Sequence, residues 1–349
     1  MIDLPDRVYK ALAEKSFGDL RNHNRLYPSS MSARLDDGKI VGSCNRAEFY
    51  RWYAAEKDSE PDPEGALIFA KGDAFHDMVV RMLRSIERQT KLRVITVEQS
   101  LWDPKYFLSG RSDAFLHDET TDTLFGTEIK SVGEGAIYST VHTPKIDHIL
   151  QSVVYLDQYN KNAKKCGLQE VAGWVILYVA RSESWKLKSY AHGSPFKHMW
   201  QYYVTIENNG DIVYVNQKHE TKSIEGGLNI NNVYKRADEL LDYISKNELP
   251  PRDFQYQYDE VTLKALADAG GLNKKDKETV DKWVNDGAEP GKLELDKGDY
   301  QCRYCSFKNT CYSNSPESFK TAQQPMHPFK KQTKLVIPTK PKEAIDGIF

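Results

Sequence analysis

Residues 106–132 read YFLSGRSDAFLHDETTDTLFGTEIKSV, in which two runs rich in aromatic and β-branched residues flank the polar segment HDETTD. Runs of this kind on either side of a polar turn are typical of paired β-strands. Residues 93–102, RVITVEQSLW, have the same character and come just before them. We therefore predict three consecutive strands between residues 92 and 132.

Helical patterns surround these strands. A long helix is predicted over residues 66–88, where apolar and small residues recur at steps of three and four. A second helix is predicted over 144–164, and the apolar run at 171–180 is typical of a strand buried on both faces. The order helix, three strands, helix, strand predicts an α/β fold with a mixed central sheet flanked by helices.

The rest of the chain divides by composition. Further strands are predicted at 185–190 and 198–206, and helices over 229–287. The expected organisation is an N-terminal helix and polar lead-in over 1–43, a main domain over 44–312 with a helical insertion at 229–298, and a flexible tail over 313–349. The tail is assigned as flexible because it is rich in proline and basic residues.

Charge and hydropathy exclude several classes of protein. The chain has 349 residues, with 48 Lys+Arg against 50 Asp+Glu and a net charge of −2, which excludes a histone-like polycation but leaves room for a local basic groove. No apolar run reaches the roughly 18 residues of a membrane span. The N-terminal segment has early acids and no apolar core, so we expect no secretory signal and a cytoplasmic protein.

Two carboxylates and a lysine stand out in the central strands. Glu128 and Lys130 are two residues apart, so they share one face of a strand. If the neighbouring strand pairs with theirs, Asp113 joins that face. Carboxylates suit Mg²⁺ or Mn²⁺, and the peptide carbonyl of Ile129 is placed to offer another ligand. A lysine beside such an ion can orient a water molecule and stabilise the charge of a transition state.

Two helices add polar side chains to this set. His76 lies four residues after Gly72 on one helix face, so its imidazole could be a further ligand, while the glycine would let the helix approach the sheet closely. Gln151 and Tyr155 are also four residues apart and could grip a phosphate or a base. Each feature has a plainer interpretation. The acids and Lys130 could form a surface ion pair, His76 could be a core histidine, and Gln151 with Tyr155 could form the solvated edge of a buried helix.

The cysteines form a separate pattern. Cys302, Cys305 and Cys311 have the spacing C-x2-C-x5-C, which indicates a metal site in a reducing compartment. The fourth ligand is expected to be Cys44, which opens an aromatic helix, with Cys166 as the competitor. Four thiolates fit a 4Fe–4S cluster or a zinc ion. Three clustered cysteines plus a remote one favour the cluster, which would join the N-terminal and C-terminal segments.

Taken in order, these motifs resemble the RecB-like branch of the PD-(D/E)XK nucleases. The flanking cysteines make the chain most similar to the iron–sulfur subgroup, which includes the CRISPR-associated RecB-like exonucleases and the AddB nuclease domain. The resemblance covers about residues 28–312. It implies a restriction-endonuclease-like fold. The residues that carry it are Cys44, Gly72, His76, Asp113, Glu128, Lys130, Gln151, Tyr155, Cys302, Cys305 and Cys311.

The resemblance also implies roles for these residues. His76, Asp113 and Glu128 would bind the metal, Lys130 would be catalytic, and the four cysteines would hold a 4Fe–4S cluster. Gln151 and Tyr155 would lie at the DNA-binding face. Arg111 flanks Asp113 and adds a basic group to that face.

We therefore expect a Mg²⁺- or Mn²⁺-dependent DNA exonuclease. Its substrate would be single-stranded or end-bearing DNA, in recombination, repair or phage DNA metabolism. The residues do not specify polarity, and family analogy favours 5′→3′. The setting would be the bacterial cytoplasm, or the host cytoplasm if the chain is phage-encoded.

Other interpretations stay open. The chain could be a non-catalytic DNA-binding or assembly subunit, a CRISPR spacer-acquisition nuclease, or a zinc protein with structural carboxylates. Arg46 stands where the family has proline, and residues 191–298 hold extra helices. The C-terminal tail, ending in EAIDGIF, could dock on a recombinase or a single-strand binding protein, or could be a plain disordered end. No membrane partner is expected.

Overall fold

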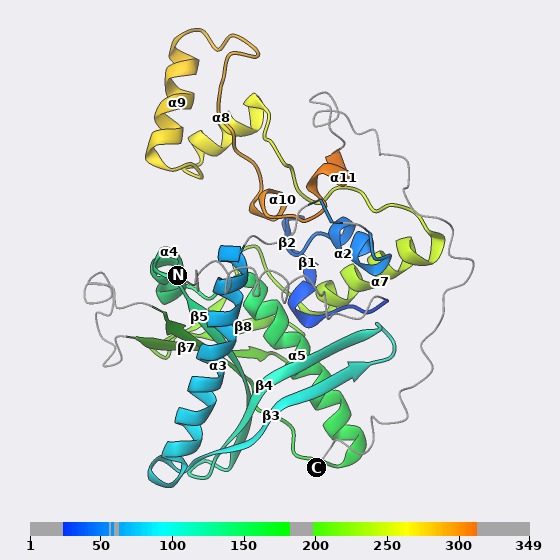
Figure 1. Cartoon of the computed structure of the whole chain (residues 1–349), viewed down its shortest axis with the longest axis vertical. Helices are drawn as coiled ribbons and strands as arrows, with labels where there is room; N and C mark the ends of the chain where they lie inside the picture. The colour runs from blue at the N-terminus through cyan, green and yellow to red at the C-terminus, as the bar shows by residue number, and fades with distance from the viewer. Residues whose placement is uncertain (1–23, 56, 59–62, 182–197, 313–349) are drawn as a thin grey trace, which may run out of the picture. The chain divides into compact units, whose positions relative to one another are not determined.

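The computed structural model describes residues 24–55, 57–58, 63–181 and 198–312 (Figure 1). The predicted N-terminal helix before residue 24, the predicted strand at 185–190 and the tail at 313–349 lie outside these ranges. The described residues form two compact units: the first holds 24–43, 63–181 and 198–246, and the second holds 44–55, 57–58 and 247–312. This division differs from the single expected domain over 44–312, because the ends of that stretch cluster with each other.

A seven-stranded mixed sheet forms the centre of the first unit. Its strands, in spatial order, are β3 (Leu92–Asp103), β4 (Leu108–Asp118), β5 (Thr123–Val132), β6 (Trp174–Ala180), β7 (Met199–Ile206), β8 (Ile212–Val215) and β9 (Thr221–Ser223). Only the β5–β6 pair is parallel, and the other neighbours are antiparallel. The predictions of a mixed sheet and of three consecutive strands are confirmed.

Helix α5 (Ile146–Cys166) packs against one face of this sheet. The core cluster on this face holds Phe115, Leu124, Tyr155, Leu156, Val171 and Trp174. Gly126 makes room for the Trp174 ring, because a Cβ at Gly126 would lie 2.2 Å from a ring carbon. A Gly126→Ala change would therefore displace the Trp174 ring from its position across β5.

Helix α3 (Pro63–Thr90) packs against the opposite face. The cluster on this side holds Val79, Val80, Ile129 and Val179. Neighbouring residues of a strand point to opposite faces, so the burial of Ile129 under α3 directs Glu128 and Lys130 to the α5 side. The sheet and its two helices therefore make a three-layer core, which agrees with the predicted flanking helices.

Smaller elements complete the first unit. They are the 3₁₀ turn η1 (Pro28–Ser30), β1 (Ser32–Arg34), β2 (Ile40–Gly42), α4 (Glu134–His142) and α7 (Ile230–Lys246). The β1–β2 hairpin lies in a segment expected to be a polar lead-in. Its strands have three residues each, too short to show a period, yet Ala33 and Met31 are buried.

The second unit is built from helices and loops. They are α2 (Asn45–Trp52), α8 (Glu260–Asp268), α9 (Lys274–Asn285), α10 (Tyr300–Arg303) and α11 (Lys308–Tyr312). Helices α8 and α9 pack together through Leu263, Ala267 and Val280, and the side chains of Asp259 and Asn273 cap their first turns. No helix within the described ranges is long and apolar enough to span a lipid bilayer.

Candidate functional site

The central feature of the first unit is the point where β4 and β5 stop pairing. Their ladder ends at the pair Ala114↔Thr127. Beyond that pair, the Ile129 N–H has no backbone partner on β4 and donates instead to Asp113 Oδ2, at 2.6 Å. The Asp113 carboxylate thus accepts the hydrogen bond that a backbone carbonyl of β4 would accept if the ladder continued. This bond fixes the Asp113 side chain between β4 and β5.

The same geometry directs the Ile129 carbonyl. In an extended strand the N–H and the C=O of one residue leave on the same side. Because the Ile129 N–H points to Asp113, the Ile129 carbonyl oxygen also leaves on the side of β4. This placement agrees with the role expected for that carbonyl.

Glu128 and Lys130 lie together on the α5 side of β5. Glu128 is 3% exposed; its Oε1 is 2.7 Å from Lys130 Nζ, while its Oε2 is buried without a hydrogen-bond partner. Burial and then the Asp113 charge raise the pKa of Glu128 to about 7. Burial would lower the pKa of Lys130, but the Glu128 and Asp113 charges outweigh it and raise that pKa.

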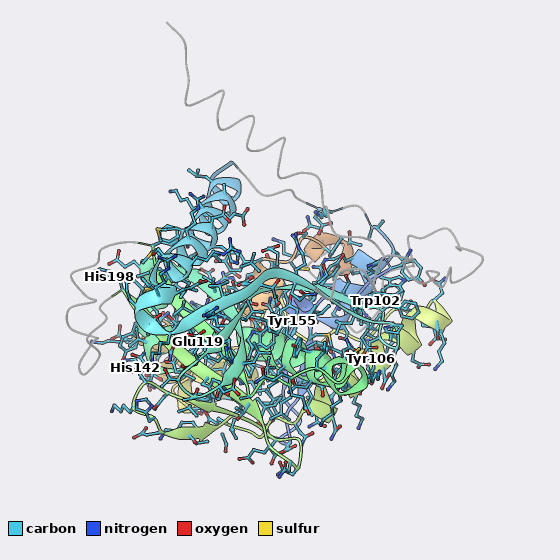
Figure 2. The ribbon with its side chains drawn as sticks, turned by 90° about the horizontal axis from the view of Figure 1, so that it is seen from below. Trp102, Tyr106, Glu119, His142, Tyr155 and His198 are labelled. Atoms are coloured by element: carbon cyan, nitrogen blue, oxygen red, sulfur yellow. The ribbon has the colours of Figure 1, made fainter. Side chains whose placement is uncertain are left out.

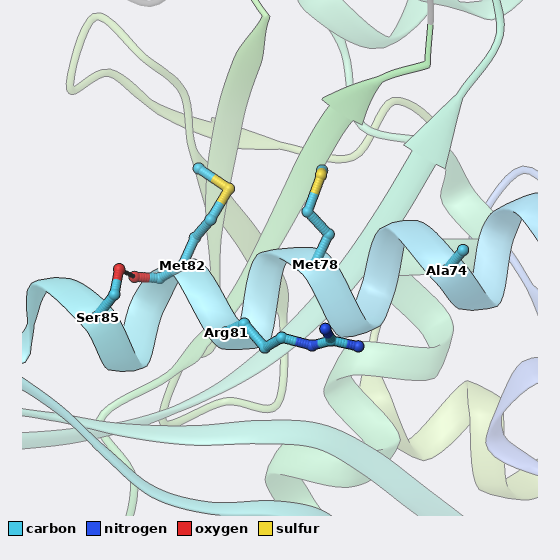
Figure 3. A pocket seen from close by; sticks show the side chains of 5 residues that line it. All are labelled: Ala74, Met78, Arg81, Met82 and Ser85. Carbon is cyan, nitrogen blue, oxygen red and sulfur yellow. Dashed lines mark hydrogen bonds between the residues drawn. The ribbon is translucent and has the colours of Figure 1, made fainter.

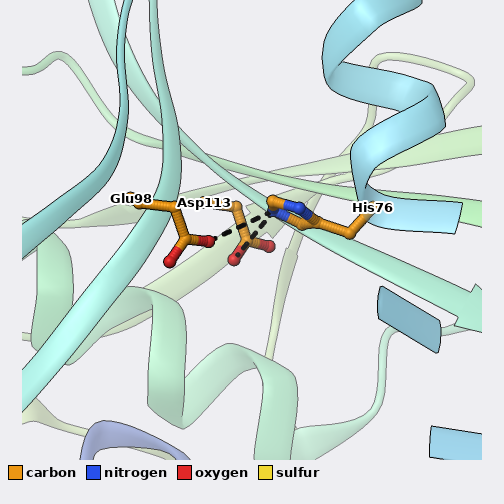
Figure 4. Close-up of side chains that lie close together, drawn as sticks. All are labelled: His76, Glu98 and Asp113. Atoms are coloured by element: carbon orange, nitrogen blue, oxygen red, sulfur yellow. Dashed lines mark ion pairs between the residues drawn. The ribbon is translucent and has the colours of Figure 1, made fainter. Parts of the chain in front are cut away.

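His76 reaches this site from α3. Its Nε2 lies 3.3 Å from Asp113 Oδ1 (Figure 4), but it is buried and makes no hydrogen bond of good geometry. The Asp113 carboxylate, and to a smaller degree Glu98, raise the pKa of His76. The prediction for Gly72 is wrong: a Cβ there would lie 3.8 Å from Ser131 Oγ, an ordinary contact, so no close approach requires glycine.

Glu98 is a member of the site that sequence reasoning missed. It lies on β3, with Oε1 4.0 Å from His76 Nε2 and Oε2 3.0 Å from Arg111 Nη1. Ligand atoms of His76, Glu98 and Asp113 all lie within 4.8 Å of one another (Figure 4). The one available signal was a single acid inside the β-rich run RVITVEQSLW, which does not reveal where its side chain points.

Gln151 and Tyr155 lie beneath the site rather than on an outer face. Gln151 Oε1 accepts a hydrogen bond from Lys130 Nζ at 3.0 Å. Tyr155 is 4% exposed and donates to the Arg111 carbonyl at 2.8 Å. Figure 2 labels it on α5, together with Trp102 near the end of β3 and Tyr106 in the turn that leads to β4. Both side chains are buried in this structure, so they do not present the DNA contact that was expected of them. Instead, Gln151 contacts Lys130 and Tyr155 contacts the Arg111 backbone.

His148 is a second residue that the sequence did not assign. Its Nδ1 lies 2.7 Å from the Tyr178 hydroxyl. Burial, and then the charges of Lys130 and Lys145, hold the pKa of His148 well below its usual range. It therefore presents a neutral imidazole beside the lysine at neutral pH.

The second unit contains the cysteine pattern. Cys44, Cys302, Cys305 and Cys311 line one hollow, whereas Cys166 is exposed at the end of α5 in the first unit. The structure thus brings together the four cysteines favoured from the sequence. It also brings a short N-terminal segment beside the C-terminal part of the described chain, within one unit.

The sulfur atoms in this hollow are not tightly gathered. Across the described ranges, only His76, Glu98 and Asp113 form a group of three ligands within 4.8 Å, so no three cysteines do. A tetrahedral zinc ion with Zn–S bonds of ~2.3 Å would bring its sulfurs to about 3.8 Å. The thiols therefore share a hollow without forming the compact tetrahedron of a zinc site.

Buried positive charge lies beside these thiols. Arg46, 2% exposed, donates through Nε to the Pro250 carbonyl at 2.7 Å, and its Nη1 lies 3.8 Å from Cys311 Sγ. Burial raises the pKa of the Cys44 thiol and raises that of Cys302 to about 12. The thiolates of Cys44 and Cys302 would therefore form only with a bound metal group, whose negative charge Arg46 could offset.

A shallow hollow also lies on the outer side of α3 (Figure 3). It is lined by Ala74, Met78, Arg81, Met82 and Ser85. The side chains of Met78 and Met82 are exposed and point to the same side, and none of the five lining residues belongs to the acidic site.

Comparison with known proteins adds little. No family model and no curated protein matches the chain. Among solved structures, one described as SSO0001 aligns with 88% of this chain and 95% of its own length, at 12% identity and a TM-score of 0.36. A likeness at that level bears on neither the fold nor the function. The case for any function therefore rests on the residues of the site.

Proposed function

We propose that the chain is a divalent-metal-dependent hydrolase that cleaves DNA phosphodiester bonds. One observation carries the proposal. Asp113, Glu128 and Lys130 meet where the β4–β5 ladder ends, and Glu128 Oε2 is buried there without a hydrogen-bond partner. An unsatisfied buried carboxylate oxygen is costly, and a cation is the partner that best offsets the cost.

The donor set fits Mg²⁺ or Mn²⁺. The oxygens of Asp113 and Glu128 and the Ile129 carbonyl are hard ligands, and His76 adds an imidazole next to Asp113. Such an ion, when bound, neutralises charge on a phosphodiester and lowers the pKa of coordinated water.

The residues around the ligands have distinct tasks. Lys130 lies next to Glu128 and is held by Gln151, so its ammonium group is fixed where it can orient a water molecule and stabilise negative charge. Arg111 is 67% exposed beside Glu98 and is available to a DNA phosphate from solvent. Tyr155 sets the position of Arg111 through its backbone carbonyl.

The substrate class follows from the resemblance described above. We propose exonuclease action on single-stranded or end-bearing DNA, of 5′→3′ polarity, in recombination, repair or phage DNA metabolism. The proposed docking of the tail on a recombinase or a single-strand binding protein concerns residues outside the described ranges.

We further propose that Cys44, Cys302, Cys305 and Cys311 hold a 4Fe–4S cluster. The support is their shared hollow and the buried Arg46 beside Cys311. The role of such a group would be structural, since it would join segments more than 250 residues apart in the chain, from Cys44 to Cys302.

The test is digestion of end-labelled linear DNA, single- and double-stranded, with Mn²⁺ or Mg²⁺. We expect stepwise release of nucleotides, no cutting of closed circles, and complete loss of cleavage with EDTA or in Asp113→Asn. Glu119→Gln, which changes an acid paired with Arg93 at the end of the β3–β4 hairpin, is the matched control and should cleave normally. DNA binding without cleavage under all these conditions would favour the non-catalytic subunit.

A further inference from the structure

One row of polar side chains ties helix α5 to three neighbouring strands. His148, Gln151 and Tyr155 follow one another at steps of three and four, so they share a helix face. Each contacts a different strand: β4 through Arg111, β5 through Lys130 and β6 through Tyr178. Gln151 and Tyr155 are buried, whereas His148 is half-buried, so it is the member of the row that solvent can reach.

The contact between His148 and Tyr178 determines which ring nitrogen of the histidine carries the proton. The Tyr178 hydroxyl accepts a hydrogen bond from the Lys145 N–H at 3.0 Å. Its own hydrogen needs an acceptor, because the Tyr178 side chain is fully buried. Among the described residues that acceptor is His148 Nδ1, 2.7 Å away. In the neutral ring, one nitrogen accepts and the other donates, so the proton of His148 lies on Nε2.

This Nε2–H group is a donor that the protein leaves unused. Within the described ranges, His148 makes no second hydrogen bond. Burial, and then the charges of Lys130 and Lys145, hold the pKa of His148 well below its usual range. The ring therefore stays neutral at neutral pH, and it offers a hydrogen bond without a positive charge that would repel a nearby cation.

His148 lies on the far side of Lys130 from the carboxylate of β4. Lys130 and Tyr178 are partners in the β5–β6 register, so their side chains share the α5 face of the sheet. Gln151, one turn after His148, accepts from Lys130 Nζ at 3.0 Å. Across the strand order, Asp113 on β4, Lys130 on β5 and His148 above β6 thus follow one another.

We propose that His148 is a further catalytic residue, whose Nε2–H donates a hydrogen bond to a non-bridging oxygen of the phosphodiester. The inference rests on the proposed function and adds a neutral donor to its charged groups. The proton stays on Nε2 throughout, and no group is transferred to or from the ring. Such a bond strengthens as negative charge builds on the phosphoryl oxygens, so it lowers the barrier more than it aids binding. Tyr178 is a positioning residue, because it holds the ring in the donating tautomer.

Two amides at position 148 test which nitrogen matters. In His148→Gln the amide nitrogen takes the place of Nε2, whereas in His148→Asn it takes the place of Nδ1. With full-length protein and Mn²⁺, we expect kcat for DNA cleavage to fall about 100-fold in His148→Asn, with KM unchanged. His148→Gln should recover most of this loss. The matched control is His142→Asn, at an exposed histidine of α4, which should cleave as the wild type does.

The tautomer is measured directly, without cleavage. Nitrogen-15 spectra of histidine-labelled protein distinguish a protonated Nε2 from a protonated Nδ1, and the His148 signal is the one missing in His148→Gln. We expect the wild type to show only the Nε2–H form. Tyr178→Phe, which removes the hydroxyl that holds Nδ1, should show both forms and should cleave faster than His148→Asn but slower than the wild type.

The outcomes separate this inference from the proposed function. His148→Gln that cleaves no faster than His148→Asn, or a wild-type ring protonated on Nδ1, would overturn the inference and leave the nuclease. A wild type that cuts no DNA would remove the nuclease. In that case an oligothymidylate added with Ca²⁺ decides: a displaced His148 Nε2 signal would support the phosphate contact, and an unmoved signal would overturn it.

Discussion

The two candidate metal sites are built in opposite ways. The acidic site stands on strands of ten to twelve residues, where a backbone N–H holds Asp113 and Gln151 holds Lys130. The cysteine hollow stands on helices α10 and α11, of four and five residues, and on the start of α2. Paired strands fix side chains without a ligand, whereas helices this short have little stability of their own. We infer that the acidic site would form before a cation binds, and that the hollow would depend on a metal group.

The two sites also differ in the protonation of their ligand side chains. The pKa of Glu128 is raised to about 7, so this carboxyl group is partly ionised at neutral pH and ready for a cation. The pKa of Cys302 is raised to about 12, so that thiol ionises only as the metal group binds. Metal binding would therefore complete the first site and create the second.

The largest expected effect is a loss of stability when one of the four cysteines of the hollow is replaced. Cys302→Ser should lower the free energy of unfolding of the second unit by more than about 4 kcal/mol, because metal binding is coupled to folding there. Hydrogen exchange measured by mass spectrometry should show fast exchange in residues 247–312 and unchanged protection in 92–132. The matched control is Cys166→Ser, an exposed cysteine of the first unit.

Bound iron should fall together with this stability. Iron and zinc assays on anaerobically purified wild-type protein identify the metal group, and zinc in place of iron would contradict the cluster. If hydrogen exchange in residues 247–312 were equally slow in Cys302→Ser and Cys166→Ser, the hollow would not depend on a metal group, and the proposed difference between the two sites would be wrong.

The next effect is catalytic and concerns the acidic site alone. Lys130→Met should slow DNA cleavage about 100- to 1000-fold, as expected for the loss of one group that stabilises a transition state. Its Mn²⁺ stoichiometry and its circular dichroism in Mn²⁺ should match the wild type, because Asp113 keeps its backbone hydrogen bond. Lys164→Met, at an exposed lysine, is the control. Wild-type cleavage by Lys130→Met would remove the assigned role.

Much of this framework follows from the sequence. The shared face of Glu128 and Lys130 was predictable because residues two apart on a strand point the same way, and the long apolar pattern of α5 predicted that helix. That Cys302, Cys305 and Cys311 line one hollow was predictable because the three residues lie within a stretch of ten. These signals are local, and the structure retains them.

The features that could not be predicted depend on how deeply a side chain is buried or on a single backbone angle. Spacing on α5 placed Gln151 and Tyr155 on one face but did not show that this face is buried. Glu98 joins the site through a left-handed φ that alternation along a strand does not encode. The clustering of residues 44–55 and 57–58 with the C-terminal part of the described chain required contacts that no local pattern reports.

The third effect is on stability and depends on pH. Because the folded-state pKa of Glu128 is raised to about 7 from 4.5, the folded chain keeps a proton that the unfolded chain releases between these values. The stabilisation is complete below pH 4.5 and is lost as the pH rises through 7. For metal-free protein the loss approaches about 3 kcal/mol.

Urea unfolding at pH 5 and pH 8 measures this loss. The fall in stability should be smaller in Glu128→Gln than in the wild type, since an amide does not titrate, and Mn²⁺ should reduce it in the wild type. Equal pH dependence of wild type and variant would show that the Glu128 carboxyl is ionised throughout the range.

The smallest expected effect separates a supporting residue from a DNA contact. Tyr155→Phe removes the hydrogen bond to the Arg111 carbonyl and should lower the free energy of unfolding by about 1 kcal/mol. DNA affinity should stay within about twofold, because the side chain is 4% exposed and cannot reach a polynucleotide. Tyr159→Phe is the matched control, because the Tyr159 hydroxyl makes a longer contact of 3.4 Å with the Gln169 carbonyl and its side chain is half-buried. A tenfold loss of DNA affinity at unchanged stability would instead show that Tyr155 contacts DNA. In that case the residues that cover its side chain would have to move when DNA binds.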